Sequence, residues 1–154
     1  MGVNQSAFPA KGKSQTWRVV VFCLGLVTGL GATEPKTLLF FGDSLTAGYG
    51  LDPDEAFPAL VQQKLDASGL AWRVVNAGLS GETTAGGLRR LDWILRQPVD
   101  IFVIELGGND GLRGIDPETS RSNLESMIRR IRERYAAIKI VLSRMQTPTN
   151  IGPA

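Results

Sequence analysis

The stretch TLLFFGDSLTAGYG (residues 37–50) passes directly from an apolar run into a turn flanked by glycines. A continuous apolar run that ends at a glycine is typical of a buried parallel strand. Ser44 follows this run closely, at the place where an α/β fold exposes a nucleophile. A serine hydroxyl needs a base to take its proton, and the usual base is histidine, but the 154 residues contain none. The stretch therefore predicts an α/β fold and a candidate nucleophile without an evident base.

Apolar runs and helical patterns alternate along the rest of the chain. Further strands are predicted over residues 72–78, 100–106 and 137–143, and helices over residues 55–67, 84–97 and from Pro117 onward. Asp116 is suited to cap the last helix, because an aspartate side chain accepts hydrogen bonds from the first N–H groups of a helix. Short right-handed connections then give a parallel sheet with helices on both faces. We therefore expect a three-layer α/β/α domain.

The last predicted helix combines an apolar stripe with many arginines. The residues of the stripe are Leu124, Met127, Ile128, Ile131 and Tyr135. The five arginines of this helix mostly fall elsewhere, which indicates a solvent-exposed face rather than a basic site for a partner. The net charge of +2 gives no argument for nucleic-acid binding either. Lys11, Lys13 and Arg18 are the only charged residues before Glu34, so the basic excess belongs to the N-terminus and the rest of the chain has a net charge of −1.

Residues 1–32 have the pattern of a signal peptide. Three positive charges precede VVVFCLGLVTGL (residues 19–30), and small residues follow at Gly31 and Ala32. The apolar run is shorter than the roughly 20 residues that a membrane-spanning helix needs. We expect cleavage near Ala32 and a periplasmic or secreted protein without a stable membrane span; a short anchor or a misassigned start codon are the alternatives. Cys23 is the only cysteine and would leave with the leader, which excludes disulfides and cysteine chemistry.

Three of the predicted strands end in loops of small and polar residues. The loops are GDSLTAGYG (residues 42–50), NAGLSGETTAGG (residues 76–87) and GGNDGLRG (residues 107–114). Ligands of open parallel sheets bind at the carboxyl ends of the strands, and glycines there let backbone N–H groups approach a substrate. Turn and cap chemistry explains any one loop alone, whereas three such loops on one edge indicate a shared site.

Two other kinds of site fit these loops less well. A nucleotide-binding module predicts a phosphate loop such as GxGxxG or GxxxxGK[ST], and neither is present. A metal site would have no histidine or cysteine near the loops, so only Asp43, Glu82 and Asp110 would remain as oxygen ligands for a hard cation. We expect no metal and no other cofactor, and we expect Asp43 to orient the loop around Ser44.

The same loops carry a resemblance to a known family. FFGDSLTAGYG, NAGLSGETTAGGLRRL and VIELGGNDGLRG resemble, in order, the first three blocks of the GDSL, or SGNH, hydrolases, and the likeness runs from about Thr37 to Gly152. The chain looks most similar to the bacterial arylesterase and periplasmic thioesterase/lysophospholipase type. The resemblance implies a flavodoxin-like fold, a monomer, and a small-molecule ester or thioester substrate. It also implies that Ser44 is the nucleophile, and that the N–H groups of Ser44 and Gly81 and the side-chain amide of Asn109 form the oxyanion hole.

The chain departs from this family at its C-terminal end. The family's fourth block, Asp-x-x-His, follows a fifth strand and supplies the base, and the chain reaches Ala154 without it. Lys64 and Lys139 fall within a predicted helix and strand, so neither replaces the histidine. We therefore expect residues 33–154 to be a hydrolase domain that lacks its last strand and helix, with its base encoded beyond Ala154. Since loss of the base costs on the order of 10⁴–10⁶ in rate, the chain as it stands should be close to inactive.

Two further hypotheses remain open. The first is a non-catalytic SGNH-like domain that binds acyl or carbohydrate esters. The second is a flavodoxin-like nucleotide binder, for which binding of a flavin or nucleotide would have to be measured.

Overall fold

The computed structural model describes Met1 and residues 34–145 of the chain. Apart from Met1, the predicted signal peptide of residues 1–32 lies outside the described residues, as does the chain after residue 145. Within residues 34–145, no helix is long and apolar enough to cross a membrane.

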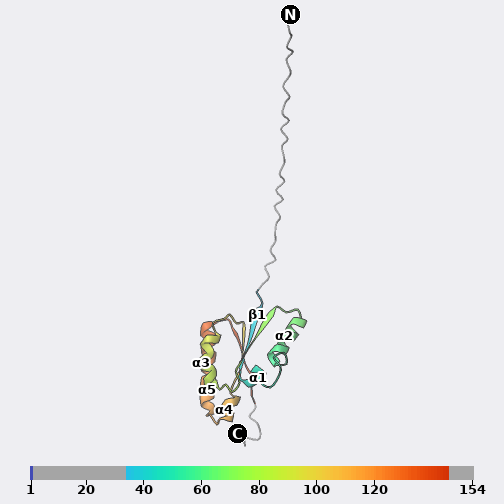
Figure 1. The fold of residues 1–154 in the computed structure, drawn as a ribbon. Helices are drawn as coiled ribbons and strands as arrows, with labels where there is room; N and C mark the ends of the chain where they lie inside the picture. Colours follow the sequence, from blue (N-terminus) through green and yellow to red (C-terminus); the bar gives the residue numbers. More distant parts are fainter. Residues whose placement is uncertain (2–33, 146–154) are drawn as a thin grey trace. The chain divides into compact units, whose positions relative to one another are not determined.

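Strands and helices alternate along the described residues (Figure 1). The strands are β1 (Lys36–Gly42), β2 (Trp72–Gly78), β3 (Ile101–Glu105) and β4 (Lys139–Leu142). The helices are α1 (Ser44–Ala47), α2 (Phe57–Ala67), α3 (Thr84–Ile94), α4 (Gly108–Leu112) and α5 (Pro117–Arg134). All strand pairs are parallel, and the order across the sheet is β2-β1-β3-β4. The predicted α/β fold with a parallel sheet is thus confirmed.

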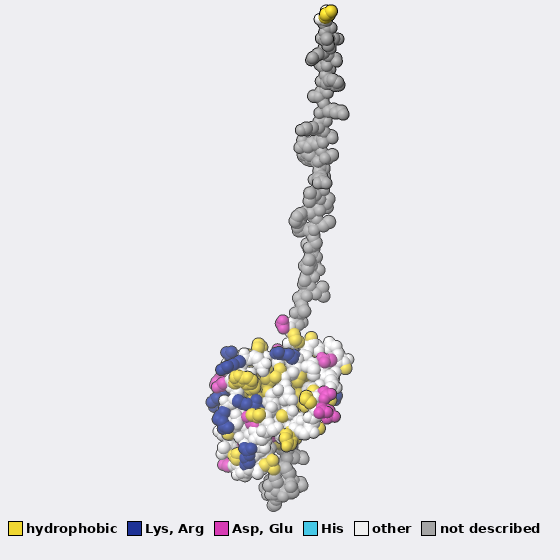
Figure 2. Space-filling model, in the orientation of Figure 1, with side chains coloured by type: hydrophobic (Ala, Val, Ile, Leu, Met, Phe, Trp, Pro, Cys, Tyr) yellow, Lys and Arg dark blue, Asp and Glu magenta, His cyan; other side chains and the backbone are white. Residues whose placement is uncertain are grey.

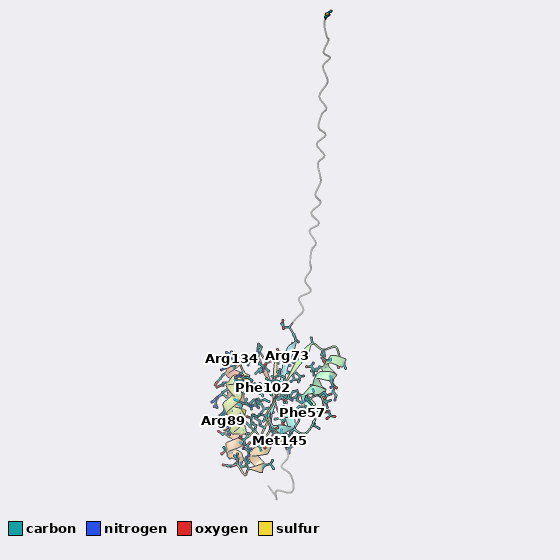
Figure 3. The ribbon with its side chains drawn as sticks, in the orientation of Figure 1. Phe57, Arg73, Arg89, Phe102, Arg134 and Met145 are labelled. Atoms are coloured by element: carbon teal, nitrogen blue, oxygen red, sulfur yellow. The ribbon has the colours of Figure 1, made fainter. Side chains whose placement is uncertain are left out.

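Helices cover both faces of the sheet. In Figure 1, α3 and α5 lie on one side of it and α2 lies on the other. Because successive residues of a strand point to opposite faces, neighbouring phenylalanines of β1 serve different layers. Phe41 packs against Phe102 with ring centroids 5.5 Å apart, and Phe40 meets Phe57 of α2 edge-on at 5.1 Å. Figure 3 labels Phe102, on the side of α3, and Phe57, on α2 itself, on the other side of the sheet.

The apolar stripe predicted for the last helix is confirmed in α5. Met127 and Ile131 are fully buried, and Leu124, Ile128 and Tyr135 pack against the same core. The arginines of α5 are exposed, and Figure 2 shows Lys and Arg side chains gathered over the α3–α5 side. The helix begins at Pro117 because the side chain of Asp116 accepts a hydrogen bond from the N–H of Glu118 at 3.1 Å.

Some predicted bounds differ from the observed ones. β2 has the predicted bounds, whereas β3 and β4 are one or two residues shorter at each end than residues 100–106 and 137–143. α2 begins at Phe57 rather than at residue 55, because Glu55 closes a turn by donating its N–H to Asp52 O at 2.9 Å. α3 ends at Ile94 rather than at residue 97, with Leu95 as its cap. α1 and α4 were missed because four and five residues are too few to show a helical period.

Candidate functional site

The carboxyl ends of three strands lie level with one another. Gly42 at the end of β1 pairs with Gly78 at the end of β2 and with Glu105 at the end of β3. The three loops singled out in the sequence leave the sheet at these residues. They therefore start at one edge, as expected for a site at the carboxyl ends of parallel strands.

Ser44 is the first residue of α1, which follows β1 directly. Asp43 caps this helix, because its Oδ1 accepts a hydrogen bond from the N–H of Leu45 at 3.0 Å. Thr46 is fully buried while Ser44 is partly exposed, so the helix presents Ser44 at the surface. Gly78 allows α1 to lie against the end of β2, since a Cβ at this position would overlap the helix backbone.

Asn109 reaches the first loop from α4, which begins shortly after β3 ends. Its side-chain Nδ2 donates a hydrogen bond to Oδ2 of Asp43 at 3.0 Å. An amide nitrogen carries two hydrogens, so this bond leaves one of them for a further acceptor. Because Asp43 directly precedes Ser44, the bond brings the Asn109 amide beside the turn that carries Ser44.

The second loop turns sharply at Gly81. The turn Leu79–Glu82 is closed by a hydrogen bond from the N–H of Glu82 to Leu79 O at 3.1 Å. Gly81 is the third residue of this turn and has φ of +77°. A type II turn requires a positive φ at that position, and glycine adopts it without steric cost. The N–H of Gly81 takes no part in the bond that closes the turn.

Hydrogen bonds join this turn to the other two loops. The N–H of Leu79 donates to Gly42 O at the end of β1 at 3.0 Å. From the end of α4, Nη2 of Arg113 donates to Gly81 O at 2.8 Å. Ser44, Gly81 and Asn109 therefore lie on three loops that are bonded to one another.

A buried carboxyl lies beneath the first loop. Glu105, the last residue of β3, is 7% exposed, and its Oε2 accepts a hydrogen bond from the hydroxyl of Thr46 at 2.7 Å. Its Oε1 is buried and has no partner within the described residues. Burial raises the pKa of Glu105, and the negative charge of Asp43 raises this pKa further, against the lowering effect of the Thr46 bond. We missed this residue in the sequence, where its signal is an acidic residue that ends an apolar strand.

The three carboxylates considered as cation ligands each have other partners. Asp43 accepts the bonds described above, and Glu82 forms an ion pair with Arg90. Asp110 is 2% exposed and accepts from the backbone N–H of Thr84 at 2.8 Å. Within residues 34–145, no three His, Cys, Asp or Glu side chains come close enough together to hold a metal ion.

Comparison with known proteins identifies one family. The model of the GDSL-like lipase/acylhydrolase family matches residues 40–154. Esterase TesA of Pseudomonas aeruginosa is 46% identical over 132 residues, which cover 85% of this chain and 65% of that protein. The chain thus spans slightly less than two thirds of the length of this relative.

Two solved structures of esterases have the same fold. The SGNH-hydrolase family esterase AlinE4 superimposes with a TM-score of 0.72 at 44% identity, covering 78% of this chain and 64% of that one. A structure of the psychrotrophic esterase EstA from Pseudoalteromonas sp., inhibited by monoethylphosphonate, gives a TM-score of 0.71 at 39% identity, covering 77% and 64%. These likenesses agree with the fold class implied by the resemblance seen in the sequence.

Proposed function

Because the chain belongs to the GDSL-like lipase/acylhydrolase family, we propose that it carries the nucleophile and the oxyanion-binding groups of a serine ester hydrolase. The observation that carries this proposal is the hydrogen bond from Asn109 to Asp43, which places a side-chain amide next to the turn of Ser44. The substrate is a small-molecule ester or thioester, and the reaction uses no cofactor.

Ser44 is the nucleophile in this proposal. Its Oγ attacks the acyl carbon, its proton passes to a base, and the carbonyl oxygen becomes an oxyanion. Collapse of this intermediate breaks the bond to the leaving alcohol or thiol, which takes up the proton, and leaves an acyl-enzyme on Ser44. Water then repeats the sequence at the same carbon and releases the acid.

Three donors bind the oxyanion: the N–H groups of Ser44 and Gly81 and the second hydrogen of the Asn109 amide. Fixed donors aimed at the developing charge are usually the largest single contribution to catalysis, and loss of one costs roughly 10²–10³ in turnover. The turn at Gly81 supports this role, because its closing bond uses the N–H of Glu82 instead.

The 154 residues contain no histidine, which is the usual base for a serine nucleophile. We propose that an Asp-x-x-His block beyond Ala154 supplies it, in the part of the domain that the relatives have in addition. We also propose that residues 1–32 direct export and are removed, and that the hydrolase domain, residues 33–154 with the missing part, acts as a periplasmic or secreted monomer.

A groove of about 490 Å³ beside α4 is the candidate site for the acyl group. Its lining is partly apolar, with Ile115, Leu124 and Leu142, and partly polar or charged, with Ser120, Arg121 and Glu125.

The test adds the proposed C-terminal block to the chain. Residues 33–154 are joined to the part of Pseudomonas aeruginosa esterase TesA that follows the matched region, and hydrolysis of p-nitrophenyl butyrate is measured for this completed chain and for residues 33–154 alone. We expect the completed chain to hydrolyse the ester and the shorter one to be slower by on the order of 10⁴–10⁶. Circular dichroism establishes that each protein is folded.

Ser44→Ala in the completed chain should abolish turnover, whereas Ser122→Ala, at an exposed serine of α5, should leave it unchanged. Full activity of the Ser44→Ala variant would overturn the proposal. A folded completed chain that binds the ester in calorimetry but does not hydrolyse it would favour the non-catalytic hypothesis instead.

A further inference from the structure

Arg90 is an arginine of α3 whose side chain turns inward. Only 22% of the side chain is exposed, and its Cζ lies 4.1 Å from the centre of the Phe41 ring in the core. Arginine is almost never buried unless it is paired, because a charge removed from water needs compensating partners. Its neighbour Arg89 is exposed, so the two adjacent arginines differ in role.

The partners of Arg90 belong to the first and second loops. Its Nε donates to Glu82 Oε2 at 2.5 Å, and its Nη2 donates to Ala77 O at 2.8 Å. The same Nη2 lies 3.4 Å from Gly42 O, at the end of β1. The planar guanidinium can reach these acceptors at once because its N–H groups form a rigid fork, which a lysine ammonium does not reproduce.

These contacts connect both ends of the Gly81 turn to one cation. The last residue of the turn, Glu82, is bound directly through its carboxylate. The first residue, Leu79, donates its N–H to Gly42 O, the carbonyl that Arg90 also approaches. Gly81 lies between these two fixed ends.

A glycine turn needs such support more than other turns do. Glycine has more accessible backbone conformations than any other residue, so an unsupported Gly81 would let its peptide groups reorient. Donors contribute to catalysis only when they are already aimed at the developing charge. Gly81 itself accepts a hydrogen bond at its carbonyl oxygen from Nη2 of Arg113, but this bond is solvent-exposed and therefore weaker.

We propose that Arg90 is a positioning residue that fixes the turn Leu79–Glu82, and through it the N–H of Gly81. The importance of this N–H rests on the proposed esterase function, whereas the fixing of the turn does not. Arg90 touches no substrate; it acts through Glu82 and the two strand-end carbonyls.

The first experiment measures amide hydrogen exchange by NMR in the 154-residue chain. In Arg90→Lys, the N–H groups of Leu79 and Glu82 should exchange at least about tenfold faster than in the wild type, while the amides of β3 keep their rates. Arg89→Lys should leave all these rates unchanged. Ile131→Val changes a core residue of α5 away from the loops and lowers only the global stability. It should therefore not speed exchange at Leu79 and Glu82 more than at the amides of β3.

If Arg90→Lys does not fold, Glu82→Gln replaces it, because this variant removes the charged partner and keeps the bonds of Arg90 to the two carbonyls. It too should speed exchange at Leu79 and Glu82. Wild-type exchange rates at both amides in a folded Arg90→Lys or Glu82→Gln variant would overturn the proposal.

The second experiment measures kcat and KM of the completed chain. Arg90→Lys should lower kcat by roughly 10–100-fold with little change in KM, as expected when only transition-state stabilisation is lost. An unchanged kcat in this variant would show that the turn does not depend on Arg90 during turnover and would count against the proposal. A completed chain that is inactive with Arg90 in place would instead contradict the esterase function, and the exchange measurement would still decide the role of Arg90.

Discussion

Asn109 donates a hydrogen bond from Nδ2 to Oδ2 of Asp43 at 3.0 Å, across 66 residues of sequence. The bond joins the start of α4 to the residue that caps α1. Asp43 is 3% exposed, and its other carboxylate oxygen is held by the N–H of Leu45, so the Asn109 amide is attached to a fixed group. An amide held in this way can offer its second hydrogen to an oxyanion without a cost in reorganisation.

Asn109→Ala in the completed chain should therefore lower turnover of p-nitrophenyl butyrate by roughly 10²–10³, with a modest change in KM. Asn109→Asp should lower turnover further, because it removes the donor and places a second carboxylate against that of Asp43. The control is Gln63→Ala, which removes an amide from an exposed position on α2. Equal turnover in the wild type and in Asn109→Ala would exclude the amide from the oxyanion site.

Gly81→Ala tests the turn itself. Gly81 has φ of +77°, and an added Cβ would meet only Nη2 of Arg113, at 3.6 Å, which is an ordinary contact. The variant therefore changes backbone preference rather than packing and should cost roughly 1 kcal/mol in stability. Gly69→Ala is the matched control, because Gly69 has φ of +66° between α2 and β2 and open space around its Cβ. Urea unfolding should give similar losses for both variants, while only Gly81→Ala should lower kcat.

Much of the fold could be predicted because the sequence signals for it are local. The apolar run WRVVNAG defines β2 at its observed bounds, and Asp116 with Pro117 marks the start of α5. The helices α1 and α4 gave no such signal, because one turn of helix is shorter than one repeat of an apolar pattern. Their position depends on the strand ends that they follow.

The site could be predicted in outline but not in its supporting contacts. That three loops share an edge follows from the parallel strand order. The partners of Glu105 and Asp43 are 59 and 66 residues away, so these pairs depend on sheet register, which no local pattern contains. Arg90 did carry a signal: it lies four residues before buried Ile94 and three after buried Gly87, on the inward face of the helix.

Asp110 should prove to be a structural residue. Its carboxylate accepts hydrogen bonds from the N–H and the hydroxyl of Thr84, at 2.8 and 2.5 Å, and from the hydroxyl of Ser120 at 3.0 Å. Asp110→Ala leaves buried donors of Thr84 without this acceptor, at about 1–3 kcal/mol for each unsatisfied group. We expect urea unfolding of the 154-residue chain to show a loss of more than about 2 kcal/mol on that basis.

The matched control for Asp110 is Asp92→Ala. Asp92 is exposed and lies 3.6 Å from Arg130, so its removal should cost less than about 1 kcal/mol, as for other surface ion pairs. Losses of equal size in the two variants would contradict the importance of the buried network.

Glu105 should make stability depend on pH in a direction opposite to that of most carboxylates. Its pKa in the folded chain lies above the ordinary value of 4.5, chiefly because of burial. As pH rises above 4.5, the unfolded chain loses this proton while the folded chain keeps it, so the stability contributed by the group falls. The contribution is fully present below 4.5 and is lost as pH rises through the folded pKa.

Glu105→Gln removes this dependence because glutamine stays neutral and can still accept the hydrogen bond from Thr46. The thermal midpoint of the variant minus that of the wild type should therefore increase as pH rises from 4.5 and level off above the folded pKa of Glu105. Glu125→Gln, at an exposed glutamate 3.0 Å from Arg121, should show no such increase. Thermal midpoints that run parallel for the wild type and Glu105→Gln between pH 4.5 and 8 would mean that Glu105 ionises normally, and hence that water or another group reaches its Oε1.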